Sequence, residues 1–475
     1  MKKFLLAALL AAVSSSALAA DPQATNPPRS QDELRAREIF SRLISYKTSV
    51  GLGQVPAMAG YLADQFRVAG FAESDIHILP LGETASLVVR YPGNGTGGKP
   101  ILLLAHMDVV TAKPEDWKRD PFTLVEEDGY FFGRGTSDVK DGVATITATF
   151  LRLKAEGFKP TRDLVIVFSG DEETEMATIQ DLVTNHRKLI DADYALNSDG
   201  GGGNLDKDGK ALIFGVQAAE KTYASFELTV RNSGGHSSLP RADNAIYELA
   251  DALKRVQAYR FPVSWNEITL AAFSAAGKAT AGPVGAAMSR FAKDQTDASA
   301  IDVLSAEPSE VGRIRTTCIP TLLRGGHADN ALPQSATATV NCRIFPGVAV
   351  KAVLATLQDV AGKNVEVVSI GAPTASDASP LRADVMAAVA KAVQANYPGT
   401  PIVPSQESGA TDGLYLRAAG IPTYGVSGMF MKETDSFAHG LNERIPVQGF
   451  YNGLEHWHAL VSELAGPGAR AAGKP

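Results

Sequence analysis

The chain contains 475 residues, of which 45% are hydrophobic and 20% charged, and its formal net charge is −7. This length exceeds what one hydrophobic core usually supports, so two domains are expected, and the composition is that of a folded protein without long disordered tracts. An acidic chain that lacks clusters of lysine and arginine has no electrostatic footprint for nucleic acid or anionic lipid. Small molecules are therefore the expected partners.

The first twenty residues have the layout of a secretory signal peptide. Two lysines precede an apolar run from Phe4 to Val13, and a stretch of small residues follows. The apolar run is too short to remain as a membrane anchor. Cleavage after Ala19 or Ala20 is therefore expected, and the short, alanine-rich form predicts a bacterial protein that is periplasmic or secreted.

Helices and strands alternate through the next part of the chain. Apolar residues at helical spacing predict helices over residues 31–46, 57–71 and 142–157, and continuous apolar runs predict strands over 86–91, 101–110 and 163–170. Buried strands that alternate with helices are typical of an α/β fold with a mostly parallel sheet covered by helices on both faces. In such sheets, ligands bind beyond the carboxyl ends of the strands.

The pattern changes after residue 216. The sequence predicts a strand over 223–232, a helix over 242–256, two strands over 313–324 and 335–345, a helix over 348–362 and a strand over 365–371, with a mainly helical stretch at about 265–312. The βαββαβ order predicts a small α+β domain with an antiparallel sheet. Residues 217–372 are therefore interpreted as an insertion between the two parts, 21–216 and 373–475, of the larger domain.

Two cysteines lie in the paired strands of this insertion. Cys318 and Cys342 are placed symmetrically about residue 330, so a hairpin would set them opposite each other. In an oxidising compartment they form either a disulfide or two buried thiols, and the sequence leaves both open.

Histidine and carboxylate side chains follow several of the predicted strands. The quoted segments are "AHMDVV", "GRGTSDVKDG", "SGDEETE", "NSDG" and "FAHGLNE". The candidate residues are His106, Asp108, Asp138, Glu172, Glu173, Asp199 and His439.

Each of these segments also has an ordinary interpretation. His106 and Asp108 could form a surface pair, Asp138 could cap the following helix, and "GDEETE" could be a solvated acidic loop. Together, however, they would converge at one sheet edge, where buried carboxylates are costly unless cations offset their charge. Nitrogen and oxygen ligands without thiolate suit zinc, with cobalt or manganese as substitutes.

This ordered set of segments, together with "GGHSSLP", resembles the two-zinc exopeptidase family that contains glutamate carboxypeptidase, carnosine-type dipeptidases, carboxypeptidase S, aminoacylase and acetylornithine deacetylase. The resemblance covers essentially the whole mature chain. It implies that residues 21–216 and 373–475 form the catalytic metallopeptidase domain and that 217–372 form a lid or dimerisation domain.

The resemblance also assigns roles to the candidate residues. It implies that His106 and Asp199 bind one zinc ion, that Glu173 and His439 bind the other, and that Asp138 bridges the two. Asp108 would orient His106, and Glu172 would act as the general base. The resemblance further implies a cis peptide bond between Asp138 and Val139.

Substrate contacts are implied by the same resemblance. His236 would stabilise the oxyanion, often from the partner subunit, and a free carboxylate of the substrate would be recognised by Asn330, Arg343, Ser408 and Gly409. Without the resemblance, His236 is an ordinary turn histidine and Arg343 a cation on the sheet surface. The lid is expected to close over the substrate and carry His236, Asn330 and Arg343 to the metals.

The leading hypothesis from the sequence is an exported di-zinc hydrolase of peptide bonds next to a free carboxylate, a carboxypeptidase or dipeptidase. An N-acyl-amino-acid deacylase is the alternative within the same family, because the same attack by water cleaves either bond. A periplasmic solute-binding protein is the alternative from another class. A homodimer through the lid is consistent with the sequence, and so is a monomer.

Overall fold

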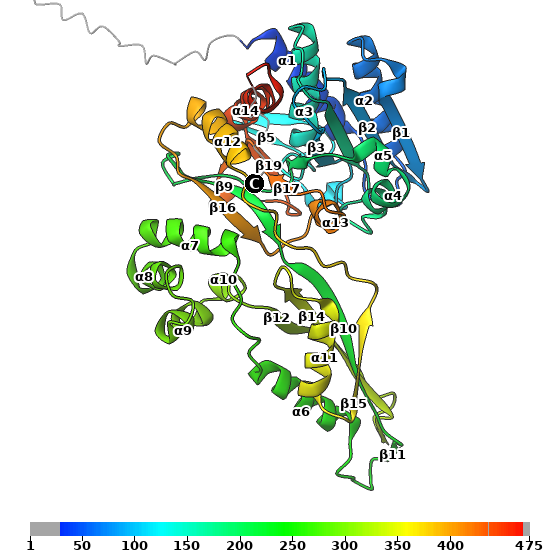
Figure 1. The fold of residues 1–475 in the computed structure, drawn as a ribbon. Coiled ribbons are helices and arrows are strands. Elements are labelled where there is room, and N and C mark those ends of the chain that lie inside the picture. The colour runs from blue at the N-terminus through cyan, green and yellow to red at the C-terminus, as the bar shows by residue number, and fades with distance from the viewer. Residues whose placement is uncertain (1–28, 436, 469–475) are drawn as a thin grey trace, which may run out of the picture.

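The computed structural model describes residues 29–435 and 437–468, so the expected signal peptide lies outside the described residues. Figure 1 shows two lobes: a larger lobe built from the first and last parts of the chain, and a smaller, elongated lobe built from the middle part. No helix within the described ranges is both long and apolar enough to cross a membrane.

A large mixed sheet runs through the larger lobe. In the described part of the chain it has ten strands in the order β1-β2-β6-β3-β7-β17-β9-β8-β18, and β16 pairs with β9. The strands are β1 (Ile76–Leu81), β2 (Thr84–Tyr91), β3 (Ile101–His106), β6 (Leu164–Ser169), β7 (Tyr194–Asn197), β8 (Gly202–Leu205), β9 (Ala211–Glu220), β16 (Ile402–Glu407), β17 (Thr423–Gly425) and β18 (Phe430–Lys432).

The centre of this sheet is parallel, as the sequence predicts. β3 pairs in parallel with both β6 and β7, and β17 pairs in parallel with β7. β1, β2 and β8 add antiparallel pairings toward the two edges. The carboxyl ends of β3, β6 and β7 therefore lie side by side, and the loops that follow them start at the same edge of the sheet.

Helices cover both faces of the large sheet (Figure 1). The side chains of β3 alternate between two apolar clusters: Leu103 packs with the cluster that includes α1, α2, α3, α12 and α14, whereas Leu102 and Leu104 pack with that of α4, α5 and α13. The helices are α1 (Gln31–Ser45), α2 (Val55–Val68), α3 (Lys140–Ala155), α4 (Ala177–Asn185), α5 (Arg187–Ile190), α12 (Ala383–Asn396), α13 (Gly413–Ala418) and α14 (Val447–Ala465).

A smaller sheet of three strands lies beside this core. β5 (Tyr130–Phe132) pairs with β4 (Val125–Glu127) and with β19 (Arg444–Pro446), so two segments that are far apart in the sequence are joined. Three short 3-10 helices, Glu73–Asp75, Pro114–Asp116 and Glu433–Asp435, lie in the connections.

The smaller lobe has the predicted βαββαβ order. Its antiparallel sheet runs β12-β14-β10-β15, with α6 and α11 packed against its apolar side. These elements are β10 (Thr222–Arg231), α6 (Ala245–Ala258), β12 (Thr317–Gly325), β14 (Ser335–Ile344), α11 (Val350–Ala361) and β15 (Val365–Ile370), and a two-stranded ribbon joins β11 (Gly235–His236) to β13 (Ala331–Leu332).

A disulfide joins β12 and β14, the two neighbouring strands that the sequence predicts as a hairpin. Cys318 on β12 is the direct register partner of Cys342 on β14, and the two sulfur atoms are bonded. Of the two alternatives that the sequence left open, the structure therefore has the disulfide.

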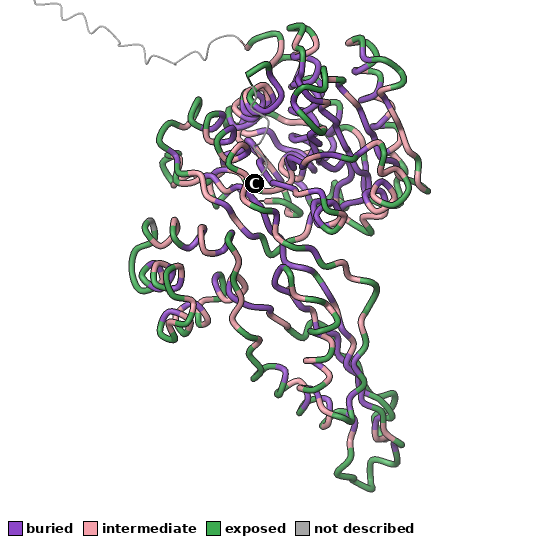
Figure 2. The backbone as a smooth tube through the Cα atoms, in the orientation of Figure 1, coloured by how far each residue is buried: buried purple, intermediate pink, exposed green. Residues whose placement is uncertain are grey.

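Four helices occupy the predicted helical stretch between α6 and β12. They are α7 (Glu267–Ala279), α8 (Gly282–Phe291), α9 (Ala298–Ala306) and α10 (Pro308–Val311). The first three pack around an apolar cluster that contains Phe273 and Phe291. Buried residues in Figure 2 are dense in the larger lobe and form a narrower band along the smaller one.

The two lobes are joined between neighbouring strands. β9 stays in the large sheet as far as Glu220, and β10 of the smaller lobe begins at Thr222.

Candidate metal centre

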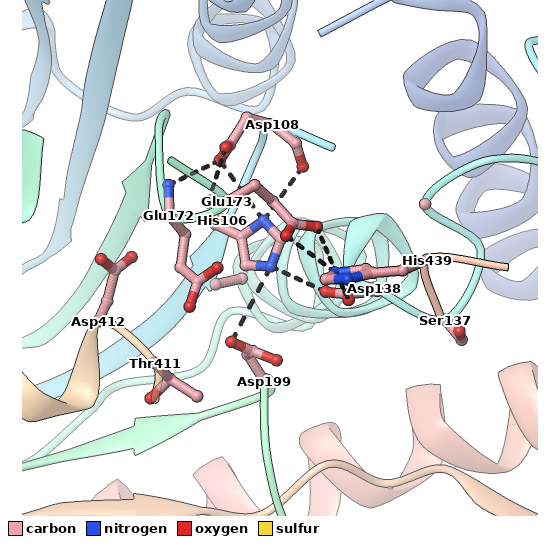
Figure 3. Close-up of polar contacts among 12 residues, drawn as sticks. His106, Asp108, Ser137, Asp138, Glu172, Glu173, Asp199, Thr411, Asp412 and His439 are labelled. Atoms are coloured by element: carbon pink, nitrogen blue, oxygen red, sulfur yellow. Dashed lines mark hydrogen bonds and ion pairs between the residues drawn. The ribbon is translucent and has the colours of Figure 1, made fainter. Parts of the chain in front are cut away.

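His106 is the last residue of β3 and one of the most buried polar residues of the site, with 1% of its side chain exposed. Its Nδ1 lies 3.1 Å from the backbone oxygen of Asp108 and 3.5 Å from Oδ1 of the same residue. Its Nε2 points the other way, 3.0 Å from Oδ1 of Asp138 and 3.9 Å from Oδ2 of Asp199. One ring nitrogen is thus held by Asp108, just after the strand, and the other faces the carboxylates of Asp138 and Asp199 (Figure 3).

Asp138 lies on the loop between β5 and α3, where the peptide bond to Val139 is cis, as the resemblance implied. Its two oxygens face different histidines: Oδ1 is 3.0 Å from Nε2 of His106, and Oδ2 is 3.0 Å from Nε2 of His439. Asp138 therefore stands between the two histidines, which is the arrangement that a bridging carboxylate requires.

Glu172 and Glu173 follow the end of β6, beside His106. The carboxylate of Asp108 accepts hydrogen bonds from the backbone N–H of Glu172 at 3.1 Å and from that of Glu173 at 3.0 Å. Asp108 therefore positions both the histidine and the turn that carries the two glutamates. The sequence predicted the first of these contacts and did not predict the second.

The turn directs the two glutamates to different partners. Oε2 of Glu173 lies 2.9 Å from Nε2 of His439. The carboxylate of Glu172 instead lies with ligand atoms of His106 and Asp199, all within 4.8 Å of one another (Figure 3).

Asp199 and His439 complete the cluster from two loops. Asp199 follows β7, and its backbone N–H donates to Oδ1 of Asn197 at 3.0 Å. His439 has a φ of 62°, and its carbonyl accepts a hydrogen bond from Arg134 at 3.2 Å. With 56% of its side chain exposed, His439 is the most accessible member of the cluster.

Several carboxylates are buried close together in this site, and the pKa values of three of them are raised. Burial raises the pKa of Glu172 to about 10 and that of Glu173 to about 7, and neighbouring carboxylates add to both shifts. Burial also raises the pKa of Asp199 well above its usual range. Without a cation, Glu172 and Asp199 would hold protons at neutral pH and Glu173 would be partly protonated. A divalent cation would stabilise the charged forms of all three.

The pKa values of the two histidines are both raised, as expected for imidazoles beside carboxylates. A hydrogen bond with Asp138 raises the pKa of His439 to about 9. Burial alone would lower the pKa of His106, but its contacts with Asp108 and Asp138 raise it well above the usual value. Among the described residues, two groups can hold a metal ion: His106 with Asp138 and Glu173, and His106 with Glu172 and Asp199.

Comparison with known proteins identifies the family. Residues 102–463 match the model of peptidase family M20/M25/M40. The chain belongs to this family. Every residue of the metal centre lies inside the matched range, and the protein is accordingly a metallopeptidase of the M20 type.

The chain is similar in sequence to relatives that have different names. The N-fatty-acyl-amino acid synthase/hydrolase PM20D1 of Xenopus tropicalis is 30% identical over 73% of this chain and 69% of its own length. Aminoacylase-1 of Mus musculus is 26% identical over 85% of this chain and 89% of its own length. Carboxypeptidase S of Saccharomyces cerevisiae is 28% identical over 54% of this chain and 47% of its own length.

The M20 fold is also found among solved structures. The metallo-carboxypeptidase Sso-CP2 of Sulfolobus solfataricus matches with a TM-score of 0.68 at 19% identity, over 91% of this chain and 99% of its own. The dinuclear metal-binding M20 peptidase YXEP of Bacillus subtilis matches with a TM-score of 0.57 at 13% identity, over 90% of this chain and 97% of its own.

Glu443 is a buried residue of this M20 site that the sequence did not single out. Its side chain is fully buried and pairs with Arg134 at 2.5 Å, while its two oxygens also accept from the backbone N–H groups of Gly135, Ser137 and Asp138 at 3.0, 2.7 and 3.2 Å. Burial raises the pKa of Glu443, and the charge of Arg134 opposes that shift. Glu443 thus holds the loop that carries Asp138.

The remaining acidic residues after β6 do not join the metal centre. Asp171 accepts hydrogen bonds from the backbone N–H groups of Ala177 at 2.7 Å and Thr178 at 2.9 Å, at the start of α4. Glu175 is exposed. Asp171 therefore caps the start of α4. The acidic sequence alone does not distinguish this role from that of a metal ligand.

The predicted substrate-binding residues fall into two separate places. Arg343 on β14 donates to the carbonyl of Ser408 at 2.8 Å and lies 4.7 Å from the ring centre of Tyr223, so Arg343 and the loop of Ser408 and Gly409 meet. His236 on β11 is near Asn330, whose carbonyl accepts from Ser237 at 3.0 Å. β11 lies at the end of the smaller lobe that points away from the larger lobe (Figure 1).

Proposed function

We propose that this M20 protein hydrolyses a peptide or amide bond next to a free carboxylate, as a carboxypeptidase or dipeptidase with two zinc ions. The observation that carries the proposal is the position of Asp138. Each of its oxygens lies 3.0 Å from a different histidine, so one carboxylate can serve two cation sites. Cobalt and manganese are candidate substitutes, because the ligand atoms are nitrogen and oxygen only.

In this proposal each cation site has its own terminal ligands. His106 and Asp199 would hold one zinc ion, Glu173 and His439 the other, and Asp138 both. When bound, the two ions supply Lewis-acid polarisation of the scissile carbonyl and a water of lowered pKa.

Glu172 is the proposed general base. Its backbone is fixed by Asp108 at 3.1 Å, and its side chain is buried beside Asp199 and His106. A carboxylate held this way can take a proton from the attacking water and donate it to the leaving nitrogen, so that the acid and base steps use the same group. The base is restored when the amine leaves.

The carboxylate of the substrate is proposed to bind at Arg343. The guanidinium is a fork of donors that matches a carboxylate, and its contact with Ser408 places it at the loop from β16, which belongs to the large sheet. The space beside Gly409 is open, since a Cβ at this position would meet nothing within 4 Å. A substrate could therefore approach the backbone there.

We propose that the protein forms a homodimer in which each chain supplies His236 to the active site of the other. Since β11 points away from the larger lobe of its own chain, His236 and Asn330 are better placed to serve a second copy (Figure 1). β12 is an edge strand whose Leu322 and Leu323 are 65% and 69% exposed. Exposed apolar edge strands favour pairing with another chain.

A second candidate substrate is an N-acyl amino acid. It is favoured by the similarity to PM20D1, whose name describes an N-fatty-acyl-amino acid synthase/hydrolase. The chemistry at the metal centre would be the same, since an amide bond next to a free carboxylate is cleaved in either case.

Export to an oxidising compartment is proposed from two observations. Residues 1–20 have the layout of a signal peptide, and Cys318 is joined to Cys342. Disulfides persist mainly outside the cytosol.

Glu172→Gln tests the mechanism, with Glu175→Gln as the matched control. Glu175 is three residues further along the same segment but exposed. With a panel of dipeptides and N-acyl amino acids, we expect Glu172→Gln to lower kcat by at least about 100-fold while metal content stays at that of the wild type, and Glu175→Gln to leave both unchanged. Full turnover by Glu172→Gln would refute the assignment, and metal binding without turnover of any substrate by the wild type would favour a solute-binding protein.

A further inference from the structure

The smaller lobe contains a groove that has no part in the metal chemistry. It has a volume of about 480 Å³ and lies between the end of α6, the ends of α9 and α10, and the start of β12. All of these elements lie in the elongated lobe of Figure 1. Its volume is in the usual range, roughly 300–1,000 Å³, for small-molecule sites.

Three cations line this groove, and among the residues that the structure describes no aspartate or glutamate does. We call it the cationic groove and define it by Lys254, Val256, Tyr259, Arg260, Arg315 and Ile319. The groove is therefore positively charged, although the net charge of the chain is −7.

Arg315 is the buried member of the three cations, with 7% of the residue exposed. Its guanidinium donates to the carbonyl of Phe261 at 3.0 Å and to Oγ of Ser305 at 2.9 Å, while its Nε has no partner within the described part of the chain. Burial lowers the pKa of Arg315, and the nearby charge of Arg260 adds to the effect. A buried cation whose partners are all neutral is costly, and an anion beside it would offset that cost.

Within the described ranges, the other two cations also bind only neutral groups. Nζ of Lys254 donates to the side-chain oxygen of Gln257 at 2.7 Å, and Arg260 donates to the carbonyl of the same residue at 3.0 Å. Both side chains are exposed at the rim. They can therefore turn toward an anion without first breaking an ion pair.

Apolar side chains line much of the rest of the groove, together with a few uncharged polar residues. Tyr259 and Phe261 pack edge to face with ring centres 5.0 Å apart, and Ile319 on β12 is 63% exposed. Val256 adds a buried aliphatic surface from α6. The combination of a cationic end and an apolar wall matches a ligand that has an anionic head and an aliphatic chain.

We propose that the cationic groove binds a single-chain amphiphile with an anionic head, the head at Arg315 and Arg260 and the chain along Val256, Tyr259 and Ile319. A carboxylate or a phosphate provides the head, because a guanidinium pairs with either. The site is separate from the metal centre, so this inference does not depend on the proposed hydrolase.

Decanoate is a suitable probe, used below the concentration at which it forms micelles. We expect calorimetric titration of the zinc-loaded mature protein to show saturable binding of decanoate, and no binding in the groove of acetate or of decyltrimethylammonium. The double variant Lys254→Ala/Arg260→Ala should weaken decanoate binding by at least about tenfold, or about 1.4 kcal/mol. Decyl phosphate, titrated in parallel, identifies the preferred head group.

Lys363→Ala is the matched control, because it removes one exposed cation from the smaller lobe outside the groove. It should bind decanoate as the wild type does. Decanoate held at the metal centre would persist in the double variant and disappear with EDTA, so the two sites are distinguishable.

Three outcomes would overturn the inference. The first is equal decanoate affinity of the double variant and the wild type, with folding verified by circular dichroism. The second is equal affinity for decyltrimethylammonium, which would mean that the groove recognises the chain alone. The third is no binding of decanoate together with a changed monomer–dimer equilibrium in the double variant, which would assign the groove to a contact between copies.

Discussion

Glu443→Gln is the substitution that best separates the positioning of the metal centre from its chemistry. Glu443 contacts no candidate ligand side chain, yet it accepts from Arg134 and from the backbone of the loop that ends at Asp138. Arg134 in turn donates to the carbonyl of His439 at 3.2 Å. One buried ion pair therefore ties together two loops that carry ligands from distant parts of the sequence.

The size of the expected loss of stability follows from the hydrogen bonds and the charge that glutamine cannot supply at position 443. Each carboxylate oxygen of Glu443 accepts from at least two donors, so the amide NH₂ of glutamine would face donors wherever it points. The charge of Arg134, with 3% of its side chain exposed, would be left without a counter-charge. Removing one partner of a buried pair costs about 3–5 kcal/mol, and we expect the free energy of unfolding to fall by that amount.

Urea denaturation and zinc titration of the variant measure the two consequences. Because the loops of Asp138 and His439 lose a common anchor, zinc affinity should fall by about 10- to 100-fold. Glu126→Gln is the matched control: it breaks the exposed pair of Glu126 with Arg37 at 3.1 Å and should cost at most about 1 kcal/mol. Arg134→Met/Glu443→Met should recover stability without recovering zinc affinity.

A Glu443→Gln protein within about 1 kcal/mol of the wild type in stability and equal to it in zinc affinity would refute this reasoning. Such a result would mean that the backbone of the two loops holds its own shape. A loss of stability with unchanged zinc affinity would refute the positioning role alone.

Three further predictions concern the metals, the disulfide and the core. In the metal-free protein the pKa of His439 is about 9 and that of Glu173 about 7, so both must release protons when zinc binds; zinc affinity measured by competition should fall by at least about tenfold per pH unit below pH 7. Cys318→Ala/Cys342→Ala opens a loop with a separation of 24 residues and should cost the smaller lobe about 3 kcal/mol in urea denaturation. Phe450→Ala removes a fully buried ring of the larger lobe and should lower the free energy of unfolding by about 3–5 kcal/mol, measured the same way; a cost below about 1 kcal/mol would show that the site collapses around the lost ring.

The convergence of the metal centre could be predicted because it depends on strand order alone. His106 ends β3, and Glu173 and Asp199 follow β6 and β7. These are three adjacent strands, of which β3 is parallel to both neighbours. Apolar runs reveal such strands in the sequence, and their shared edge then places the residues that follow them.

The supporting residues were not predictable in the same way. Asp171 caps α4 and Glu443 binds a distant loop. In the sequence, Asp171 is one of several acids in a run, and Glu443 is a single acid near His439. Their roles depend on backbone N–H groups that only the folded loops bring within reach. Hydrogen bonds of this kind leave no periodic signal, because the donor can belong to any residue type.

The placement of His236 shows a different reason why a sequence cannot define an active site. The resemblance gave its role, and strand periodicity gave the antiparallel sheet around it, but neither gives the direction in which the smaller lobe points from the larger one. β11 lies at the far end of that lobe (Figure 1), whereas Arg343, in the four-stranded sheet of the same lobe, reaches Ser408 at 2.8 Å. If a second copy supplies His236, mixing a His236→Ala chain with a Glu172→Gln chain should restore activity, because each mixed dimer contains one site with neither substitution. Mixtures that remain as inactive as the separate variants, although mixed dimers form, would place His236 in the site of its own chain.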